Sequence, residues 1–363
     1  MSYDVVIAGA GIIGSSIAWR LAQGGLHVAL FDAGRMGNEA SSAGAGMLAP
    51  GGEIEGRSPW NDFALESLRL YPDFVAELHS DSGCAIDFQV LGAVELALYE
   101  DQWRALEARA RVQASLGIPS IPMSPNDLKK QVALGLREAA GALFYPKDAH
   151  VDPRQVMYAL RSACLKREVA ILEGVRVKEM RPKRNSVEVL TDQGVIESAA
   201  AVLAAGAWSS EITVAGQSLP RAYPVRGHLI GFRLEPGSVG SIVRQGQTYL
   251  LQRTNGFTIA GSSAEHAGFN RSVDMVTAGQ IHARAAELLP ALGMLMPEER
   301  WVGFRPAVEG DTPAVGRAGS LPLWLAYGHY RNGILLAPAT AERVAREIIS
   351  SSGKSSSWLG GMR

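Results

Sequence analysis

The sequence predicts an α/β protein in which a discontinuous Rossmann-like domain is interrupted by an inserted mixed α+β domain. Three observations support this prediction. The chain opens with a short apolar strand, a glycine-rich turn and a helix pattern; a continuous apolar strand lies near residue 201; and alternating strands fill much of the remaining sequence. At 363 residues the chain also exceeds one ordinary hydrophobic core, so two intertwined or sequential domains are expected.

The first element is a strand at Asp4–Ala8 that leads directly into the sequence GAGIIG and a helix. In this turn Gly9 allows the tight bend, Gly11 lets the backbone approach a pyrophosphate, and Gly14 lets the helix pack closely on the strand. A second strand ends on Asp32, which lies 21 residues after Gly11 and can accept hydrogen bonds from ribose hydroxyls. These features predict a dinucleotide site, and they leave NAD, NADP and FAD open.

The next segment, Ala40–Pro50, consists mostly of small residues. It is either a flexible loop or a backbone surface that contacts a flat or polyanionic ligand. A helix from about Pro59, a strand near Gly92–Leu98 and a second helix follow. Ser124-Pro125 and Asp152-Pro153 each combine an N-cap residue with proline in the first turn, so each predicts the start of a helix.

Short alternating strands are expected between residues 170 and 205, and they end in the apolar strand Ala201–Trp208. Strands also dominate Tyr223–Ser263, and helices are predicted at Thr277–Leu288 and Ala339–Ser350. We therefore expect a nucleotide-binding domain and a substrate domain, each made of separate segments, followed by a flexible tail. The predicted ranges are 1–52, 150–219 and 301–350 for the first, 53–149 and 220–300 for the second, and 351–363 for the tail.

The composition is that of a globular protein, with 47% hydrophobic and 20% charged residues. The net charge is −1, which argues against nucleic acid as the main partner because a phosphate-binding face needs a basic excess. Cys84 and Cys164 belong to no metal-binding pattern, so we expect no metal site and a reducing compartment. The apolar stretch Val5–Ile13 is too short to span a membrane. These observations favour a cytoplasmic protein.

Motifs along nearly the whole chain resemble one family. The chain is similar to the FAD-dependent glycine oxidases of the D-amino-acid oxidase superfamily, bacterial enzymes that serve thiamine biosynthesis. The sequence GHYRNGILLAPAT near the C-terminus is the most specific of the matching stretches, which are Gly9–Gly14 with Asp32, Ala40–Pro50, Ala149–Arg154, Ala205–Ser209, Pro224–Gly227, Trp301–Pro306 and Gly328–Thr340.

The resemblance implies FAD as the cofactor and the fold of a glutathione-reductase-type flavoprotein. Independently, the turn dipeptide Asn332-Gly333 precedes a helix whose N-terminus can face the electron-rich side of a reduced flavin, although an ordinary turn would look the same. The residues that the family pattern assigns to FAD are Gly9, Gly11, Ile12, Ile13, Gly14, Asp32, Ala33, Ala40, Ser41, Ala45, Gly46, Met47, Val177, His329, Tyr330, Arg331, Asn332, Gly333, Ile334 and Leu335.

Three residues match the family's substrate-binding positions. Arg305 corresponds to the arginine that binds the substrate carboxylate, a task suited to a planar fork that stays charged when desolvated. Tyr249 corresponds to the tyrosine whose hydroxyl supports the same carboxylate, and Arg331 to a second arginine near substrate and flavin. From the residues alone, a surface or ion-paired arginine and a half-buried strand tyrosine remain open alternatives.

The resemblance implies oxidative deamination of a small amine or amino acid. A hydride passes from the substrate Cα to flavin N5, O2 is reduced to H2O2, and no general base is needed when the amine enters neutral. The sequence Ser262-Ser263-Ala264 stands where some relatives carry a bulkier apolar residue. Substrates larger than glycine therefore stay open, including sarcosine, other N-alkylglycines, small D-amino acids and cyclic imino acids such as proline.

Two other functions remain as alternatives. One is a flavoprotein dehydrogenase of a D-amino or imino acid that passes electrons to a quinone or partner protein. The other is a non-enzymatic FAD-binding module, against which Arg305 and Tyr249 argue because such a module needs no carboxylate-binding pair. The resemblance also implies a homotetramer.

Overall fold

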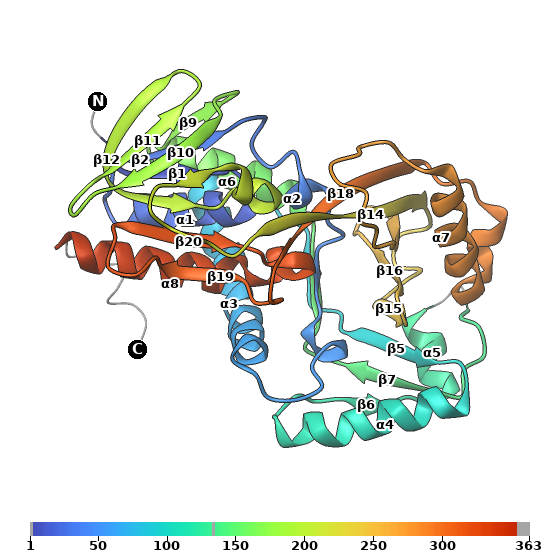
Figure 1. Ribbon diagram of the computed structural model, residues 1–363. Helices are drawn as coiled ribbons and strands as arrows, with labels where there is room; N and C mark the ends of the chain where they lie inside the picture. Colours follow the sequence, from blue (N-terminus) through green and yellow to red (C-terminus); the bar gives the residue numbers. More distant parts are fainter. Residues whose placement is uncertain (1–2, 133–134, 354–363) are drawn as a thin grey trace.

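The computed structural model describes residues 3–132 and 135–353, and the predicted α/β class is confirmed. The chain forms two lobes, each built on a large sheet (Figure 1). The part of the predicted tail that covers residues 354–363 lies outside the described residues.

The first sheet contains the Rossmann-type arrangement, with parallel strands in the order β9-β2-β1-β12-β20. An antiparallel extension runs from β12 through β11 and β10, and β13 and β19 lie at the edges. The strands are β1 Tyr3–Ala8, β2 Val28–Asp32, β9 Ala170–Glu173, β10 Val177–Pro182, β11 Val187–Thr191, β12 Gly194–Leu203, β13 Thr213–Val214, β19 Ala314–Arg317 and β20 Leu323–Tyr327.

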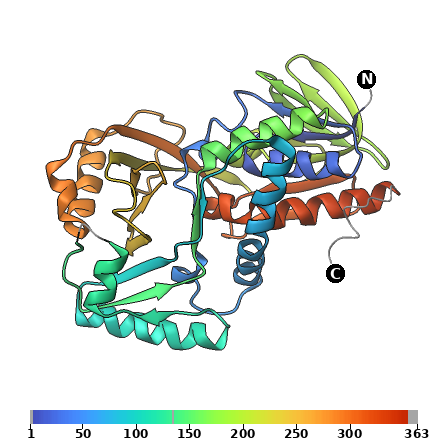
Figure 2. The same cartoon turned by 180° about the vertical axis from the view of Figure 1, so that it is seen from behind.

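Alternate residues of β1 enter two different cores. Val5 and Ile7 pack among helices, whereas Val6 and Ala8 pack against the antiparallel extension. Both faces of this strand are therefore buried, as expected for a central parallel strand. Helix α8 runs along α1 (Figure 1), and in Figure 2, the view from behind, α3 crosses in front of α8. The helices of this layer are α1 Ile12–Gln23, α3 Pro59–Ser82, α6 Pro153–Lys166 and α8 Gly333–Ser352.

The second sheet has the order β18-β14-β17-β16-β15-β5-β7-β6 and is mixed, because β15 pairs with β5 in parallel. Its strands are β5 Ala93–Ala97, β6 Ile121–Pro122, β7 Gly141–Tyr145, β14 Ala222–Arg233, β15 Ile242–Gln245, β16 Thr248–Gln252, β17 Phe257–Gly261 and β18 Glu299–Val308. Its helices are α4 Glu100–Ser115, α5 Pro125–Gln131 and α7 Met275–Leu288. By pairing, β18 belongs here although the proposed nucleotide domain resumes at residue 301. We retain the domain division as a proposal, with β18 as the strand shared by both lobes.

The remaining elements are short. A small sheet joins β3, β8 and β4, and single helical turns occur in several loops. These elements are α2 Ala40–Ala43, β3 Met47–Leu48, β4 Phe88–Gln89, β8 Ala149–Val151, η1 Pro50–Gly52, η2 Gly206–Glu211, η3 Pro290–Met294 and η4 Tyr330–Asn332.

The predicted helix starts at Ser124-Pro125 and Asp152-Pro153 are confirmed. Ser124 Oγ accepts from the Asp127 N–H at 3.2 Å, and Asp152 Oδ1 accepts from the Arg154 N–H at 2.9 Å. The expected strand over Ala201–Trp208 is too long. It ends at Leu203, because Gly206 has a φ of +56° and starts a helical turn.

The C-terminal helix begins at Gly333, six residues before the predicted start at Ala339. It continues through Pro338, whose nitrogen cannot donate to the carbonyl of Ile334. Instead, the Tyr71 hydroxyl of α3 donates to Ile334 O at 3.1 Å. Ser67 Oγ likewise donates to Leu335 O at 2.6 Å and accepts from the Ala339 N–H at 3.2 Å. Helix α3 therefore satisfies the backbone groups that the proline disturbs.

Candidate active site

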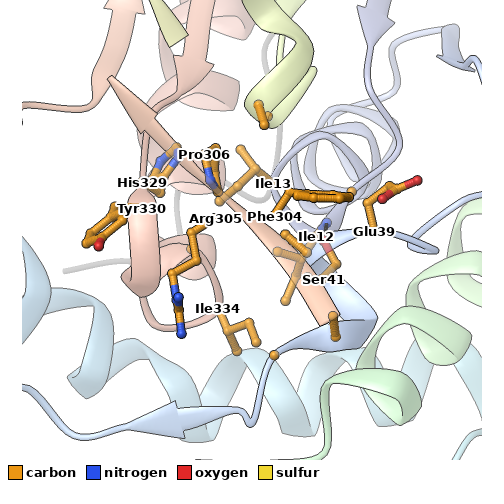
Figure 3. Close-up of a pocket in the computed structure, with 18 of the residues that line it drawn as sticks. Ile12, Ile13, Glu39, Ser41, Phe304, Arg305, Pro306, His329, Tyr330 and Ile334 are labelled. Atoms are coloured by element: carbon orange, nitrogen blue, oxygen red, sulfur yellow. Dashed lines mark hydrogen bonds between the residues drawn. The ribbon is translucent and has the colours of Figure 1, made fainter. Parts of the chain in front are cut away.

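A cavity of about 660 Å³ extends across both lobes. Its walls come from the β1–α1 turn, the α2–β3 segment, the start of α8, and strands β14, β16 and β18. This volume falls within the usual range for a small-molecule or cofactor site. In Figure 3, His329 and Tyr330 lie on one side of the labelled residues and Glu39 on the other.

The glycines of the β1–α1 turn cannot be replaced without collision. Gly9 has a φ of +106°, and a Cβ there would lie 2.3 Å from Ala204 O. A Cβ on Gly14 would lie 1.9 Å from Gly9 O. At the end of β2, Asp32 Oδ2 accepts from the Ala10 N–H at 2.9 Å, which fixes its carboxylate beside the turn. The turn therefore has the close packing expected of a dinucleotide-binding fingerprint.

The start of α1 suits an anion. Its N-cap residue, Gly11, supplies no side-chain cap, and the first turn contains no acidic residue. The Ile12 N–H donates to Ser41 Oγ at 2.8 Å, so a hydroxyl oxygen lies at the positive end of the helix dipole. Since Gly11 and Ile12 line the cavity, a pyrophosphate fits this position.

The α2–β3 segment is held by side chains of the second lobe. Trp301 Nε1 of β18 donates to Ala43 O at 2.8 Å. Arg253, which is buried, donates to Ala45 O and to Val151 O, the latter at 2.8 Å. Gly46 has a φ of +82°, and a Cβ there would lie 2.0 Å from Val151 O. The segment is thus a supported cavity wall, in agreement with the second of the two readings of Ala40–Pro50.

The C-terminal wall consists of η4 and the first residues of α8. His329 is buried and bonds to Thr340 Oγ1 through Nε2 at 3.1 Å, and burial lowers the pKa of its imidazole to about 4. Arg331 lies 3.3 Å from Glu53 Oε1 through Nε, and Asn332 Nδ2 donates to Glu53 Oε2 at 3.4 Å. The guanidinium of Arg331 therefore already has a carboxylate partner.

Arg305, by contrast, has no carboxylate partner in residues 3–132 and 135–353. Its Nη1 donates to Ser263 O at 2.8 Å and its Nη2 to Ser262 Oγ at 2.9 Å. Figure 3 shows the guanidinium extending from β18 away from the ring of Phe304. These two hydrogen bonds orient the guanidinium without neutralising it, so it can bind an anion in the cavity.

Tyr249 lies beside this arginine. Burial raises the pKa of its hydroxyl, while the charge of Arg305 and a hydrogen bond with Ser262 act in the opposite direction. A Cβ on Gly261 of β17 would lie 2.4 Å from the Tyr249 hydroxyl, so the glycine leaves room for the phenol ring. We call Arg305 and Tyr249 the substrate clamp.

The structure brings nearly all predicted site residues to one cavity. Gly14 and Leu335 do not line it: Gly14 packs on the turn, and Leu335 lies in the core of the helix layer. The residues that line the cavity are Gly9, Gly11, Ile12, Ile13, Asp32, Ala33, Ala40, Ser41, Ala45, Gly46, Met47, Val177, Tyr249, Arg305, His329, Tyr330, Arg331, Asn332, Gly333 and Ile334. Their individual roles remain predictions.

Other cavity residues were not predicted. Arg271 forms a two-pronged ion pair with Glu39, at 2.9 and 2.7 Å, and its guanidinium lies over the rings of Trp208 and Phe304. Glu53 faces Arg331. Each of these pairs joins residues far apart in sequence, and no local pattern identifies such partners.

Within the described ranges, no group of three or more histidines, cysteines or acidic residues could hold a metal ion. In the same ranges, no helix is long and apolar enough to cross a membrane.

The fold and the cavity define a dinucleotide-dependent protein in which a second sheet closes the cofactor site. The family model of the FAD dependent oxidoreductases called DAO matches residues 4–347. A glycine oxidase from Geobacillus kaustophilus is 31% identical over 350 residues, covering 94% of this chain and 92% of the relative. The glycine oxidase of Bacillus subtilis is 30% identical over 364 residues, covering 99% and 96%. The crystal structure of glycine oxidase from Geobacillus kaustophilus superimposes with a TM-score of 0.90 at 29% identity, covering 96% of this chain and 95% of that one.

The chain therefore belongs to the DAO family of FAD dependent oxidoreductases, and FAD is its cofactor.

Proposed function

We propose that this protein oxidises glycine or a related small amino acid or amine with FAD and O2, releasing H2O2. The observation that carries the proposal is the substrate clamp. Arg305 presents a guanidinium without a carboxylate partner among the described residues, next to the Tyr249 hydroxyl, in the same cavity as the dinucleotide fingerprint. The glycine oxidases that resemble this chain over nearly its whole length support the same substrate class.

The residues of the cavity fit FAD. Gly11 supplies no side-chain cap of its own at the start of α1, and Gly9 and Gly46 occupy positions where a Cβ would collide with backbone oxygen atoms. When bound, FAD supplies a hydride acceptor at N5, and its reduced form can be reoxidised by O2.

The clamp orients the substrate. The guanidinium of Arg305 binds the carboxylate, and the Tyr249 hydroxyl donates to one of its oxygen atoms. Because burial raises the pKa of Tyr249, this hydroxyl stays protonated and remains a donor. Because the carboxylate is fixed, the Cα–H bond of the substrate can occupy only a restricted set of positions. This restriction lowers the activation barrier for transfer of the Cα hydrogen. The imine formed from glycine or another primary amino acid hydrolyses to a 2-oxo acid and ammonia, whereas the imine formed from sarcosine releases methylamine.

No basic side chain is needed to remove the Cα hydrogen when the amine arrives neutral. The histidine of the C-terminal wall, His329, has a pKa lowered to about 4 by burial, so it carries no charge near neutral pH. We assign it a packing role in the wall. We keep Arg331 as a second arginine near substrate and flavin; Glu53 pairs with its guanidinium at 3.3 Å.

The walls beside the clamp are small. Ser262, Ser263 and Ala264 line the cavity, and Ser262 and Ser263 accept hydrogen bonds from Arg305. We therefore include sarcosine, small D-amino acids and proline-like imino acids in the proposed substrate range. We propose a cytoplasmic homotetramer, which light scattering and cell fractionation would examine.

A substrate panel tests the proposal. The purified flavoprotein is mixed with glycine, sarcosine, D-alanine and D-proline in air, and H2O2 release is measured alongside flavin absorbance. Bleaching with stoichiometric peroxide supports the oxidase. Bleaching that persists in air without peroxide would instead identify a dehydrogenase, and neither bleaching nor peroxide with any of the four would remove the proposed substrate class.

A further inference from the structure

The two acceptors that orient Arg305 are consecutive residues, Ser262 and Ser263, directly after β17. Their position therefore decides where the guanidinium points. Two residues further along, Glu265 Oε1 accepts from the Ser263 hydroxyl at 2.6 Å. Ser263 therefore accepts from Arg305 through its backbone carbonyl and donates to Glu265 through its side-chain hydroxyl.

Glu265 is itself fixed by strand β14. Its Oε2 accepts from Arg226 Nη2, and Oε1 accepts from His228 Nδ1 at 2.8 Å. Backbone hydrogen bonds of 2.9 Å between residues 226 and 265 run in both directions. Arg226 Nη1 also donates to Asn270 O and Ser272 O, each at 3.3 Å. The loop after β17 is therefore attached to β14 through this glutamate and its arginine, and also through Ser263 Oγ, which accepts from the His228 N–H at 3.0 Å.

The hydrogen-bond partners of His228 determine which of its ring nitrogens carries the proton. Its Nε2 accepts from the Asp274 N–H at 2.9 Å, so the ring proton lies on Nδ1, where it can be donated to Glu265. The ring is fully buried. Burial works against ionisation of Glu265, but hydrogen bonds from Ser263 and Arg226 outweigh it and lower the pKa of this carboxyl. The glutamate is therefore an acceptor for all three neighbours.

None of Arg226, His228 and Glu265 lines the cavity, whereas Ser262 and Ser263 do. The Glu265 side chain therefore reaches the cavity through Ser263, whose carbonyl accepts from Arg305. We propose that Glu265 is a positioning residue for Arg305, one that sets the orientation of the guanidinium toward the substrate carboxylate. This inference rests on the proposed function only in taking that carboxylate as the ligand of Arg305.

The test compares Glu265→Ala and Glu265→Gln with the wild-type holoenzyme. Glu265→Ala removes the acceptor of Ser263, so we expect KM for glycine to rise about tenfold or more while kcat changes less than about threefold. Glu265→Gln keeps an acceptor oxygen and the side-chain shape, so it should restore most of the lost affinity. Glu298→Ala is the matched control, because Glu298 pairs with Arg233 at 3.3 Å on the same lobe and away from the serines.

A double-mutant cycle separates positioning from folding. On an Arg305→Ala background, Glu265→Ala should raise KM by less than about twofold, because the group through which it acts is absent. An equal rise on both backgrounds, or an unchanged KM in the single variant, would overturn the inference.

A binding experiment with acetate distinguishes failure of this inference from failure of the proposed function. Acetate binding is followed by the change that it causes in flavin absorbance. Wild-type protein that binds acetate but oxidises none of the panel disproves the proposed function alone. Glu265→Ala is then judged by acetate Kd, with the same tenfold expectation. Wild-type protein that does not bind acetate would overturn the clamp and this inference together.

Discussion

Gly227 lies against the guanidinium of Arg305, and a Cβ at position 227 would be 2.3 Å from Arg305 Nη1. The two residues belong to adjacent antiparallel strands, in which Val225 pairs with Arg305 and Gly227 with Gly303. The absence of a side chain at position 227 is therefore a condition for the arginine's orientation.

Gly227→Ala should displace the guanidinium without disturbing the nucleotide end of the cavity. We expect KM for the amino acid to rise at least about tenfold, since a displacement of about 1 Å is costly for a positioned group. Flavin content should stay at the wild-type level. Gly56→Ala, where a Cβ would meet nothing within 4 Å, is the control. A variant with wild-type KM would show that the guanidinium has room to move.

Arg305→Ala tests the clamp directly. Loss of the charged hydrogen-bonded pair with the substrate should cost on the order of 2–5 kcal/mol, which corresponds to a rise in KM of well over tenfold. The flavin spectrum should be retained. Steady-state kinetics measures the effect, and Arg271→Ala serves as a comparison because it removes another cavity arginine that is already paired with Glu39. Similar effects of both variants would argue against a special role of Arg305.

Gly14→Ala should abolish cofactor binding. The added Cβ would lie 1.9 Å from Gly9 O, so either α1 or the turn must move away from its position. Flavin absorbance of the purified protein should fall to a small fraction of the wild-type value. Gly279→Ala, in the open interior of α7, should keep its flavin and gain about 0.5–1 kcal/mol of stability. Full flavin occupancy in Gly14→Ala would contradict the packing described above.

Tyr71→Phe tests how helix α8 accommodates Pro338. The substitution leaves Ile334 O without the hydroxyl donor, which should lower the free energy of unfolding by about 1–3 kcal/mol. Denaturant unfolding of Tyr71→Phe and of the exposed control Tyr158→Phe measures the difference. Equal stabilities would mean that another group satisfies this carbonyl.

Acid should destabilise the protein partly through buried histidines. The pKa values of His329 and His150 are both lowered to about 4, by burial and, for His150, also by Arg253. Between that value and the ordinary value near 6.5, the unfolded chain binds protons that the folded chain does not, so stability falls as pH falls through this window. From pH 7 to pH 5, each histidine should contribute a loss of about 2 kcal/mol.

His329→Asn isolates one of these contributions. Unfolding at pH 7 and pH 5 should show a pH effect smaller than that of the wild type by about 2 kcal/mol. An undiminished effect would assign the acid sensitivity to other groups.

Local signals were sufficient for the nucleotide end of the protein. Gly14 and Asp32 each perform a steric or hydrogen-bonding task that depends on neighbours within one βαβ unit, whereas Gly9 makes room for Ala204, which follows β12. The substrate end required the family resemblance, because Arg305 and Tyr249 lie on β18 and β16, which come together only through β14 and β17. The early start of α8 could not be predicted, since the groups that repair it belong to Ser67 and Tyr71, more than 260 residues away.

The order of the strands has a consequence for synthesis. The fingerprint at Gly9–Gly14 is translated before β12 and β20 Leu323–Tyr327, the strands that extend its sheet on one side. Helix α8, which covers α1, is translated after both strands. A nascent chain thus carries its cofactor fingerprint without a complete binding site until α8 has been translated. FAD capture therefore follows the synthesis of α8, and a chain truncated before Gly333 should not bind FAD.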